Sequence, residues 1–137
     1  MLRARDVMSR NVISVQKDTP ILEAVKLLVE NNISGLPVVE DDMTLVGILT
    51  EKDILRLFYA LKDAENKTVS DFMTQPAVHF NENESLLDIC DCLMNNPFRR
   101  VPVTSKGKVI GIISRQDFVE YILRLRRESV STVTNTK

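Results

Sequence analysis

The chain has 137 residues, of which 44% are hydrophobic and 27% are charged, and its formal net charge is -1 at neutral pH. This composition excludes a chain that is disordered throughout, and the balanced charge argues against a general nucleic-acid binder, which usually carries a clear positive excess. No stretch approaches the ~20 consecutive apolar residues that span a bilayer, and the first residues lack the apolar region of a secretory signal, so we expect a cytoplasmic protein without membrane contact.

The first half of the chain predicts the order strand, helix, strand, strand, helix, over residues 1–62. An extended piece over 12–15 leads to a helix that Thr19 caps, that Pro20 begins and that the Asn pair at 31–32 ends. Two nearly continuous apolar runs, over 36–39 and 45–49, predict strands covered on both faces and joined by a polar turn. A closing helix is expected over 51–62, followed at 63–70 by a polar linker and the start of the next unit.

The same order of elements returns over residues 71–127. We expect an extended piece at 77–80, a helix that Ser85 caps and that ends at 95–97, strands at 101–104 and 109–113, and a closing helix at 115–127. Cys90 and Cys92 lie two apart on the first of these helices, so their side chains point in different directions and do not pair; with a single histidine, no metal site is expected.

The end of the chain combines an arginine cluster with a polar segment. Arg124, Arg126 and Arg127 are interpreted as a solvated helix terminus, where cations suit the helix dipole. Residues 128–137 are rich in Ser, Thr and Val, and we expect them to form a polar, flexible tail.

An internal duplication dominates the sequence. Asp-Val-Met-Ser at 6–9 returns as Asp-Phe-Met-Thr at 71–74, and Leu-Pro-Val at 36–38 returns as Val-Pro-Val at 101–103, both 65 positions later. Gly-Ile-Leu-Thr-Glu-Lys-Asp at 47–53 returns as Gly-Ile-Ile-Ser-Arg-Gln-Asp at 111–117. One copy of about 60 residues buries too little surface to be stable alone. We therefore expect the copies to pack sheet against sheet with pseudo-twofold symmetry, leaving two clefts between them.

The last motif of each copy, Thr50-x-x-Asp53 and Ser114-x-x-Asp117, has two physical interpretations. In one, the hydroxyl caps the following helix and the aspartate three residues later completes a capping box. In the other, the helix start binds a phosphate while the carboxylate accepts hydrogen bonds from ribose hydroxyls. The residues alone favour capping, although the two roles can coexist.

Together, these three duplicated motifs closely resemble the CBS domain, and the tandem resembles the regulatory CBS pair called a Bateman module. The resemblance covers residues 3 to 125 and implies an α+β fold, with each repeat ordered strand-helix-strand-strand-helix. It also implies a binding site for AMP, ADP or ATP, or for a related ligand such as S-adenosylmethionine or NAD, without a catalytic cofactor. Such modules commonly form homodimers and regulate an attached or partner protein.

In related pairs, each cleft takes its ribose and phosphate contacts from one repeat and its base pocket from the other. Carried over to this chain, the resemblance implies one cleft lined by Met8, Ile13, Ile33, Ser34, Arg99, Arg100, Ile112, Ser114 and Asp117. It implies a second cleft lined by Ile48, Thr50, Asp53, Met73, Val78 and Phe98. Because the basic pair Arg99-Arg100 is expected only in the first cleft, and guanidinium groups suit phosphate, we expect the nucleotide to prefer that cleft. A solvated surface pair is the alternative interpretation of the two arginines.

Three classes of function follow. The preferred one is a stand-alone nucleotide sensor that signals to a separate effector protein in trans. The alternative is a dimerising scaffold that has kept the fold and lost the ligand. An enzyme is disfavoured, since the sequence contains no Ser-His-Asp or Cys-His set and no phosphate-binding glycine loop.

Overall fold

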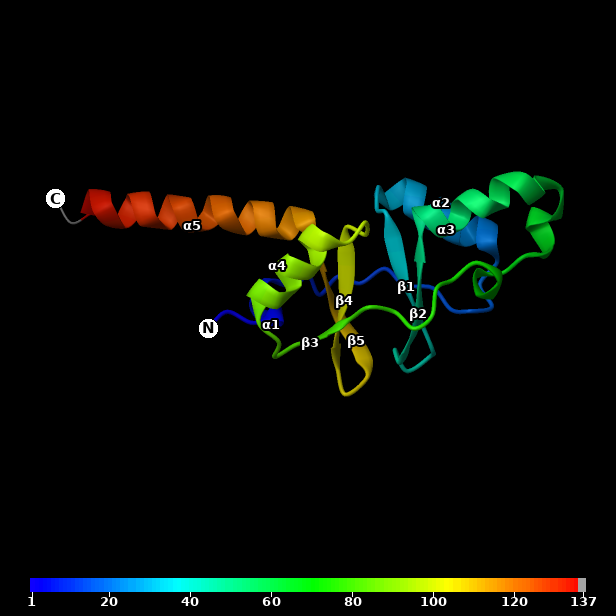
Figure 1. Cartoon of the computed structure of the whole chain (residues 1–137), viewed down its shortest axis with the longest axis horizontal. Coiled ribbons are helices and arrows are strands. Elements are labelled where there is room, and N and C mark those ends of the chain that lie inside the picture. Colours follow the sequence, from blue (N-terminus) through cyan, green and yellow to red (C-terminus); the bar gives the residue numbers. More distant parts are fainter. Residues whose placement is uncertain (136–137) are drawn as a thin grey trace.

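The computed structural model describes the backbone of residues 1–135 and the side chains of residues 1–129. Two small β-sheets lie next to each other at the centre, most of the helices lie at one side of them, and the last helix projects away from the body (Figure 1). The first sheet pairs β1 (Gly35–Val39) with β2 (Leu45–Thr50), and the second has the order β3 (Phe80–Asn81), β4 (Arg100–Ser105), β5 (Lys108–Ser114).

The helices fall into two similar sets. They are α1 (Ala4–Val7), α2 (Ile21–Asn31), α3 (Glu51–Ile54), the 3₁₀ segments η1 (Leu55–Asn66) and η2 (Val69–Asp71), α4 (Leu86–Asn95) and α5 (Arg115–Asn135). The α+β fold and the duplication are therefore confirmed. The four long strands begin or end within a residue of their predicted bounds.

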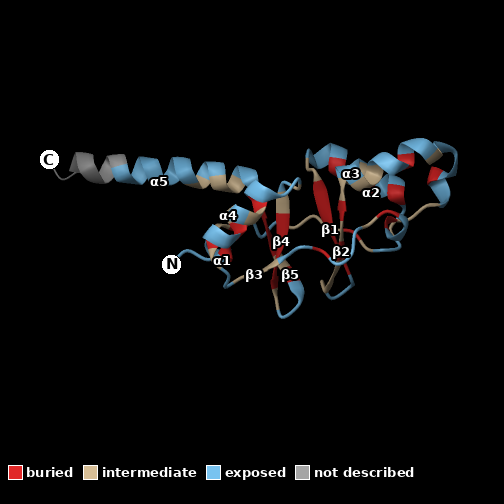
Figure 2. Cartoon of the chain, viewed as in Figure 1, coloured by how far each residue is buried: buried red, intermediate tan, exposed pale blue. Residues whose placement is uncertain are grey.

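The duplication extends to the details of strand pairing. Val15 bridges Val38 in parallel, as Phe80 of β3 pairs in parallel with Val103 of β4. Each antiparallel pair shifts register after the valine that follows the strand proline, at Val38 in the first repeat and Val103 in the second. Figure 2 shows buried residues concentrated on these central strands, as expected from apolar runs covered on both faces.

Each hydrophobic core is completed by a segment from the other repeat. Val69 and Phe72, at the start of the second repeat, are buried in the core that contains Ile21, Leu36 and Leu49. The equivalent N-terminal segment, with Ala4 and Met8, is buried in the core of Leu86, Ile89, Val101 and Ile113. The stretch at 63–70 is therefore a packed segment rather than a simple polar linker. Neither repeat has a complete core without the other.

Two helix predictions for the first repeat are wrong. Thr19 does not cap α2: its Oγ1 accepts from the backbone N–H of Gln16 at 3.0 Å, because the hydroxyl closes the preceding turn instead. The closing helix is α-helical only to Ile54 and continues as the 3₁₀ segment η1, with non-helical dihedral angles at Ala60. The chain turns back here, so that Ala64 and Val69 both reach the first core.

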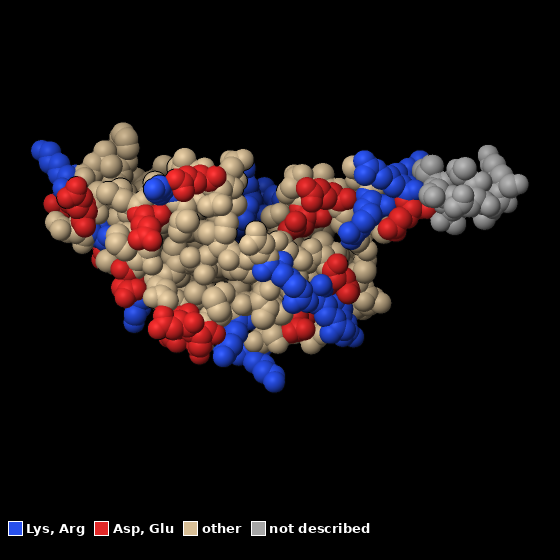
Figure 3. Space-filling model, turned by 180° about the vertical axis from the view of Figure 1, so that it is seen from behind, with Lys and Arg blue, Asp and Glu red and all other residues tan. Residues whose placement is uncertain are grey.

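Helix α5 is longer than expected. It continues past Arg127 to Asn135, because no glycine or proline interrupts it, so residues 128–135 are helical rather than an irregular tail. The remaining residues of the expected tail, 136–137, lie outside the described part of the chain. The arginine cluster consequently lies well inside the helix and not at a terminus where the dipole would favour it. Basic side chains gather on this part of α5 in Figure 3.

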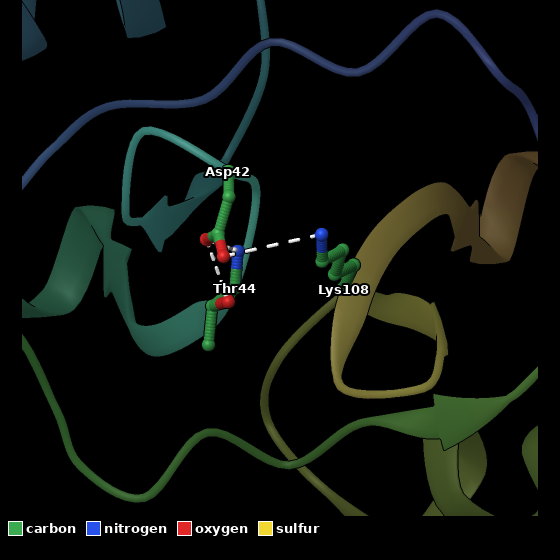
Figure 4. A network of polar contacts seen from close by, with 3 residues as sticks. All are labelled: Asp42, Thr44 and Lys108. Carbon is green, nitrogen blue, oxygen red and sulfur yellow. Dashed lines mark hydrogen bonds and ion pairs between the residues drawn. The ribbon is translucent and has the colours of Figure 1, made fainter.

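The tips of the two hairpins contact each other (Figure 4). The backbone N–H of Val109 donates to the carbonyl of Met43 at 2.9 Å, and Lys108 Nζ lies 3.9 Å from Asp42 Oδ2. Thr44 donates to Asp42 Oδ1 from its hydroxyl at 2.6 Å and from its backbone N–H at 3.0 Å. The Thr44 hydroxyl, then its N–H and, more weakly, Lys108 hold the pKa of Asp42 below its ordinary value.

We predict that Asp42→Asn removes a pH-dependent part of the stability. A carboxylate whose pKa is lowered on folding stabilises the fold above its ordinary pKa, and this contribution is lost as the pH falls through the lowered pKa. Urea unfolding should therefore show a small gap between wild type and variant at neutral pH, and this gap should narrow as the pH falls below the ordinary aspartate pKa of about 3.9. Asp63→Asn, an exposed change outside the hairpin, controls for net charge, and a gap that does not vary with pH would contradict the prediction.

We also predict that two adjacent leucines of α4 differ sharply in their contribution to stability. Leu86 is 6% exposed within the second core, whereas Leu87 is 79% exposed. Leu86→Ala should lower the free energy of unfolding by about 2–5 kcal/mol, and Leu87→Ala should change it by less than about 0.5 kcal/mol. Urea denaturation measures both; similar losses in the two variants would show that this core is assigned wrongly.

Candidate functional site

Both Thr/Ser-x-x-Asp motifs form capping boxes at the start of a helix. In the first repeat, Asp53 N–H donates to Thr50 Oγ1 at 3.3 Å and Thr50 N–H donates to Asp53 Oδ2 at 2.9 Å. In the second, the matching distances between Ser114 and Asp117 are 3.2 and 2.8 Å. The capping interpretation is confirmed. It leaves both carboxylates only partly buried, at the mouths of two clefts.

The larger cleft, termed the Asp53 cleft, has a volume of about 660 Å³, within the usual range for small-molecule sites. It lies beside the capped start of α3 and takes its other wall from the second repeat. Its lining comprises Ser34, Gly35, Ile48, Thr50, Glu51, Lys52, Asp53, Leu55, Arg56, Thr74, Pro76, Val78, Pro97, Phe98, Arg99, Arg100 and Val101.

The smaller cleft, termed the Asp117 cleft, has a volume of about 340 Å³ and lies beside the capped start of α5. Its other wall comes from the first repeat. The lining residues are Ser9, Asn11, Ile13, Asn31, Ile33, Gly35, Pro37, Arg100, Ile112, Ser114 and Asp117.

As predicted, each cleft is lined by residues from both repeats. Ile13 and Ile33 of the first repeat lie with Ser114 and Asp117 of the second, joined by Ile112. Val78 and Phe98 of the second repeat lie with Thr50 and Asp53 of the first, joined by Ile48.

The two predicted methionines do not belong to the clefts. An added Cβ on Gly111 would lie 2.6 Å from Met8 Sδ, and one on Gly47 would lie 3.4 Å from Met73 Sδ, so each methionine packs against a strand glycine of the opposite repeat. Met8 is buried in the second core and Met73 packs against the first. Each thioether fills space that a side chain on the glycine would occupy.

The predicted distribution of arginines is also wrong. Arg99 and Ser34 line the Asp53 cleft and not the Asp117 cleft, while Arg100 lines both. Arg99 precedes β4, whereas Arg100 is its first residue and lies at the boundary of the two clefts. Both arginines therefore line the Asp53 cleft, and the reason for expecting a preference for the Asp117 cleft is lost.

Sequence reasoning missed four polar residues of the Asp53 cleft, Glu51, Lys52, Arg56 and Thr74. Lys52 and Arg56 line it, and Arg56 is held by a 2.6 Å hydrogen bond from Nη2 to the Phe72 carbonyl. Thr74 donates from Oγ1 to Asp53 Oδ1 at 3.0 Å. A signal was available, since Thr74 closes the duplicated Asp-x-Met-Thr motif and Arg56 follows Asp53 by one helical turn.

The two aspartates differ in their remaining contacts. Asp53 accepts hydrogen bonds on both carboxylate oxygens, from Thr50 on one and from Thr74 on the other. Asp117 accepts on Oδ2 from Ser114, and among the described residues none donates to its Oδ1. The Asp117 carboxylate therefore keeps a free acceptor oxygen facing its cleft.

Arg100 lies at the start of β4, half-buried between the clefts. Its Nε is buried, and none of the described residues accepts a hydrogen bond from it. Burial lowers the pKa of the guanidinium, and attraction to the Asp117 carboxylate partly offsets this. The group carries a positive charge with an unused donor.

Comparison with known proteins identifies the fold and the family. The family model of the CBS domain matches twice, at residues 4–60 and 69–124. The chain belongs to the CBS domain family. The matched CBS copies correspond to the two repeats, and each holds one of the capped helix starts.

Similar proteins include CBSX2, a chloroplastic CBS domain-containing protein of Arabidopsis thaliana, which is 31% identical over 88% of this chain and 62% of its own length. Protein MJ1225 of Methanocaldococcus jannaschii is 33% identical over 86% of this chain and 42% of its own length. This chain thus spans about two fifths to three fifths of these relatives.

Similar solved structures include complexes with adenosyl ligands. A crystal structure of CBSX2 in complex with AMP has a TM-score of 0.82 and 32% identity, covering 92% of this chain and 99% of the other. The CBS domain pair of MJ0100, in complex with 5′-methylthioadenosine and S-adenosylmethionine, has a TM-score of 0.76 and 28% identity, covering 89% and 96%. Within the described residues, no helix has the length and apolar composition that crossing a membrane requires.

We predict that Ser114→Ala lowers the free energy of unfolding by about 1 kcal/mol, because the variant loses the side-chain acceptor for the Asp117 N–H. Urea denaturation measures the change. Ser70→Ala, at an exposed position outside both clefts, should leave stability nearly unchanged. An equal effect of the two substitutions would show that the Ser114 hydroxyl does not stabilise the start of α5.

Proposed function

We propose that this chain is a CBS-pair regulatory module that binds an adenine nucleotide between its repeats and signals to a separate effector protein in trans. The observation that carries the proposal is the pairing, in each cleft, of a carboxylate and hydroxyl at a helix start with apolar side chains from the other repeat. That arrangement suits a nucleotide, which joins a polar sugar phosphate to a flat apolar base. The AMP complex of CBSX2 supports the choice of an adenine ligand.

The Asp53 cleft is the better candidate for a ligand that carries phosphate. It contains Lys52, Arg56, Arg99 and Arg100, whereas Arg100 is the basic residue among those that line the Asp117 cleft. Guanidinium groups bind phosphate through paired, charge-assisted hydrogen bonds. We therefore assign AMP, ADP or ATP to the Asp53 cleft, with Val78 and Phe98 against the base.

The Asp117 cleft suits an adenosyl ligand with less negative charge, because Arg100 is, among the described residues, the one basic residue that lines it. Its volume is about half that of the Asp53 cleft, and its carboxylate has an acceptor oxygen available for a ribose hydroxyl. Ile13 and Ile33 supply an apolar surface for the base. S-adenosylmethionine, which carries no phosphate, is the first ligand to test in this cleft.

We expect regulation rather than catalysis, and a homodimer as the working form. The polar side chains that line the clefts can bind the phosphate and ribose groups of a ligand. Several apolar side chains are exposed on η1 and α5, including Phe58, Tyr59 and Ile122, and an apolar surface of this kind favours self-association. This same surface favours the second candidate function, a dimerising scaffold that binds no ligand.

Cys90 and Cys92 are both free thiols, which is compatible with a reducing compartment such as the cytoplasm.

Isothermal titration with AMP, ADP, ATP, S-adenosylmethionine and NAD tests the proposal. We predict that Asp53→Ala weakens the binding of AMP by about tenfold or more, because a charge-assisted contact is lost. Asp18→Ala, an exposed carboxylate outside both clefts, should bind like wild type.

Thermal unfolding distinguishes the two candidate functions. A ligand present at about 100 times its dissociation constant stabilises the fold by about 2.7 kcal/mol. Each variant is compared with its own ligand-free midpoint, because Asp53→Ala also removes a capping contact. No shift in the wild type with any of the five ligands would favour the scaffold.

A further inference from the structure

Positions 35 and 100 are equivalent in the duplication, and they form the boundary between the two clefts. Both Gly35 and Arg100 line the Asp53 cleft and also the Asp117 cleft. One position has no side chain, whereas the other carries a guanidinium group. The boundary therefore contributes one cationic side chain, that of Arg100, to the lining of both clefts.

The guanidinium of Arg100 is not committed to a partner within the protein. Among the described residues, no ion pair joins it to a carboxylate, and its buried Nε has no acceptor. Asp117, one of the two candidate ribose-binding residues, attracts it electrostatically. A buried donor without an acceptor is costly, so a phosphate that reaches Arg100 from either side gains a contact that the protein itself does not provide.

We propose that Arg100 serves both clefts in turn, so that two phosphate-bearing ligands compete for a single guanidinium. This inference rests on the proposed function and adds to it that AMP also binds, more weakly, in the Asp117 cleft. A phosphate in the Asp53 cleft draws Arg100 away from the Asp117 cleft and removes the basic residue from the lining of that cleft. Occupation of one cleft therefore weakens anion binding in the other, and by linkage the effect is reciprocal.

The ligand's charge decides whether the coupling appears. Adenosine has the same base and ribose as AMP but no phosphate, so it has nothing to offer Arg100. Two adenosine molecules should therefore bind independently. This contrast separates the electrostatic role of Arg100 from any effect of its side chain on the shape of the clefts.

The test isolates each cleft by disabling the other. Asp117→Ala leaves the Asp53 cleft intact, and Asp53→Ala leaves the Asp117 cleft intact. Arg100→Met is added to each, and AMP and adenosine are titrated calorimetrically. We expect Arg100→Met to weaken AMP binding by about tenfold in both backgrounds and to leave adenosine binding unchanged.

Three further substitutions serve as controls. Arg99→Met, at a residue that lines only the Asp53 cleft, should weaken AMP binding in the Asp117→Ala background alone. Arg127→Met removes an exposed charge on α5 and should have no effect in either background. Arg100→Lys, which keeps the charge without the planar fork, should give an intermediate loss and guards against a folding defect in Arg100→Met.

The outcomes separate the inference from the function on which it rests. A loss of AMP affinity in only one background, or an equal loss for adenosine, would overturn the role of Arg100 while leaving nucleotide binding in place. Absence of AMP binding in both backgrounds and in wild type would overturn the proposed function as well. In the wild type, a first AMP should weaken the second by about fivefold or more, and Arg100→Met should abolish that difference.

Discussion

The fold depends on the exchange of short segments between the repeats. Ser9 and Ile112 pair through two backbone hydrogen bonds of 2.9 Å, and Ile48 and Thr74 pair in the equivalent way at 3.0 and 2.8 Å. These ladders hold each leading segment against the sheet of the opposite repeat, where its apolar residues complete a core. The clefts follow from the same exchange, because the residues after each leading segment pass beside the other repeat's capped helix start.

Much of this architecture was predictable because the same pattern of motifs and elements occurs twice in the sequence. The strands around Pro37 and Pro102 were placed correctly, since each continuous apolar run is flanked by polar turns and repeated at a constant offset. Helix boundaries were harder. Thr19 is a residue type that often caps helices, but its hydroxyl accepts a hydrogen bond within the preceding turn. Helix α5 extends beyond residue 127, although the polar composition of the following residues predicted that it would end there. Local propensity alone does not distinguish these outcomes.

The candidate site was predictable in its chemistry and less so in its geometry. Thr50, Asp53, Ser114 and Asp117 lie at clefts because a cap and a ligand site need the same helix start. Met8 and Met73 were misplaced because their partners are glycines on another strand, a tertiary relation that spacing does not show. Arg100 lines both clefts and Arg99 only one, and the order of residues alone does not specify which cleft each side chain reaches.

The exchange of segments also sets an order of events during synthesis. Ala4 and Met8 are synthesised before the residues that cover them, Leu86, Val101 and Ile113, which lie in the second repeat. The segment at 4–8 therefore stays uncovered until the second repeat has been made as far as Ile113. Contacts of such long sequence separation slow folding and leave apolar surface exposed meanwhile. A nascent chain of this protein has a long interval in which a chaperone, or a second nascent copy, can reach the segment first.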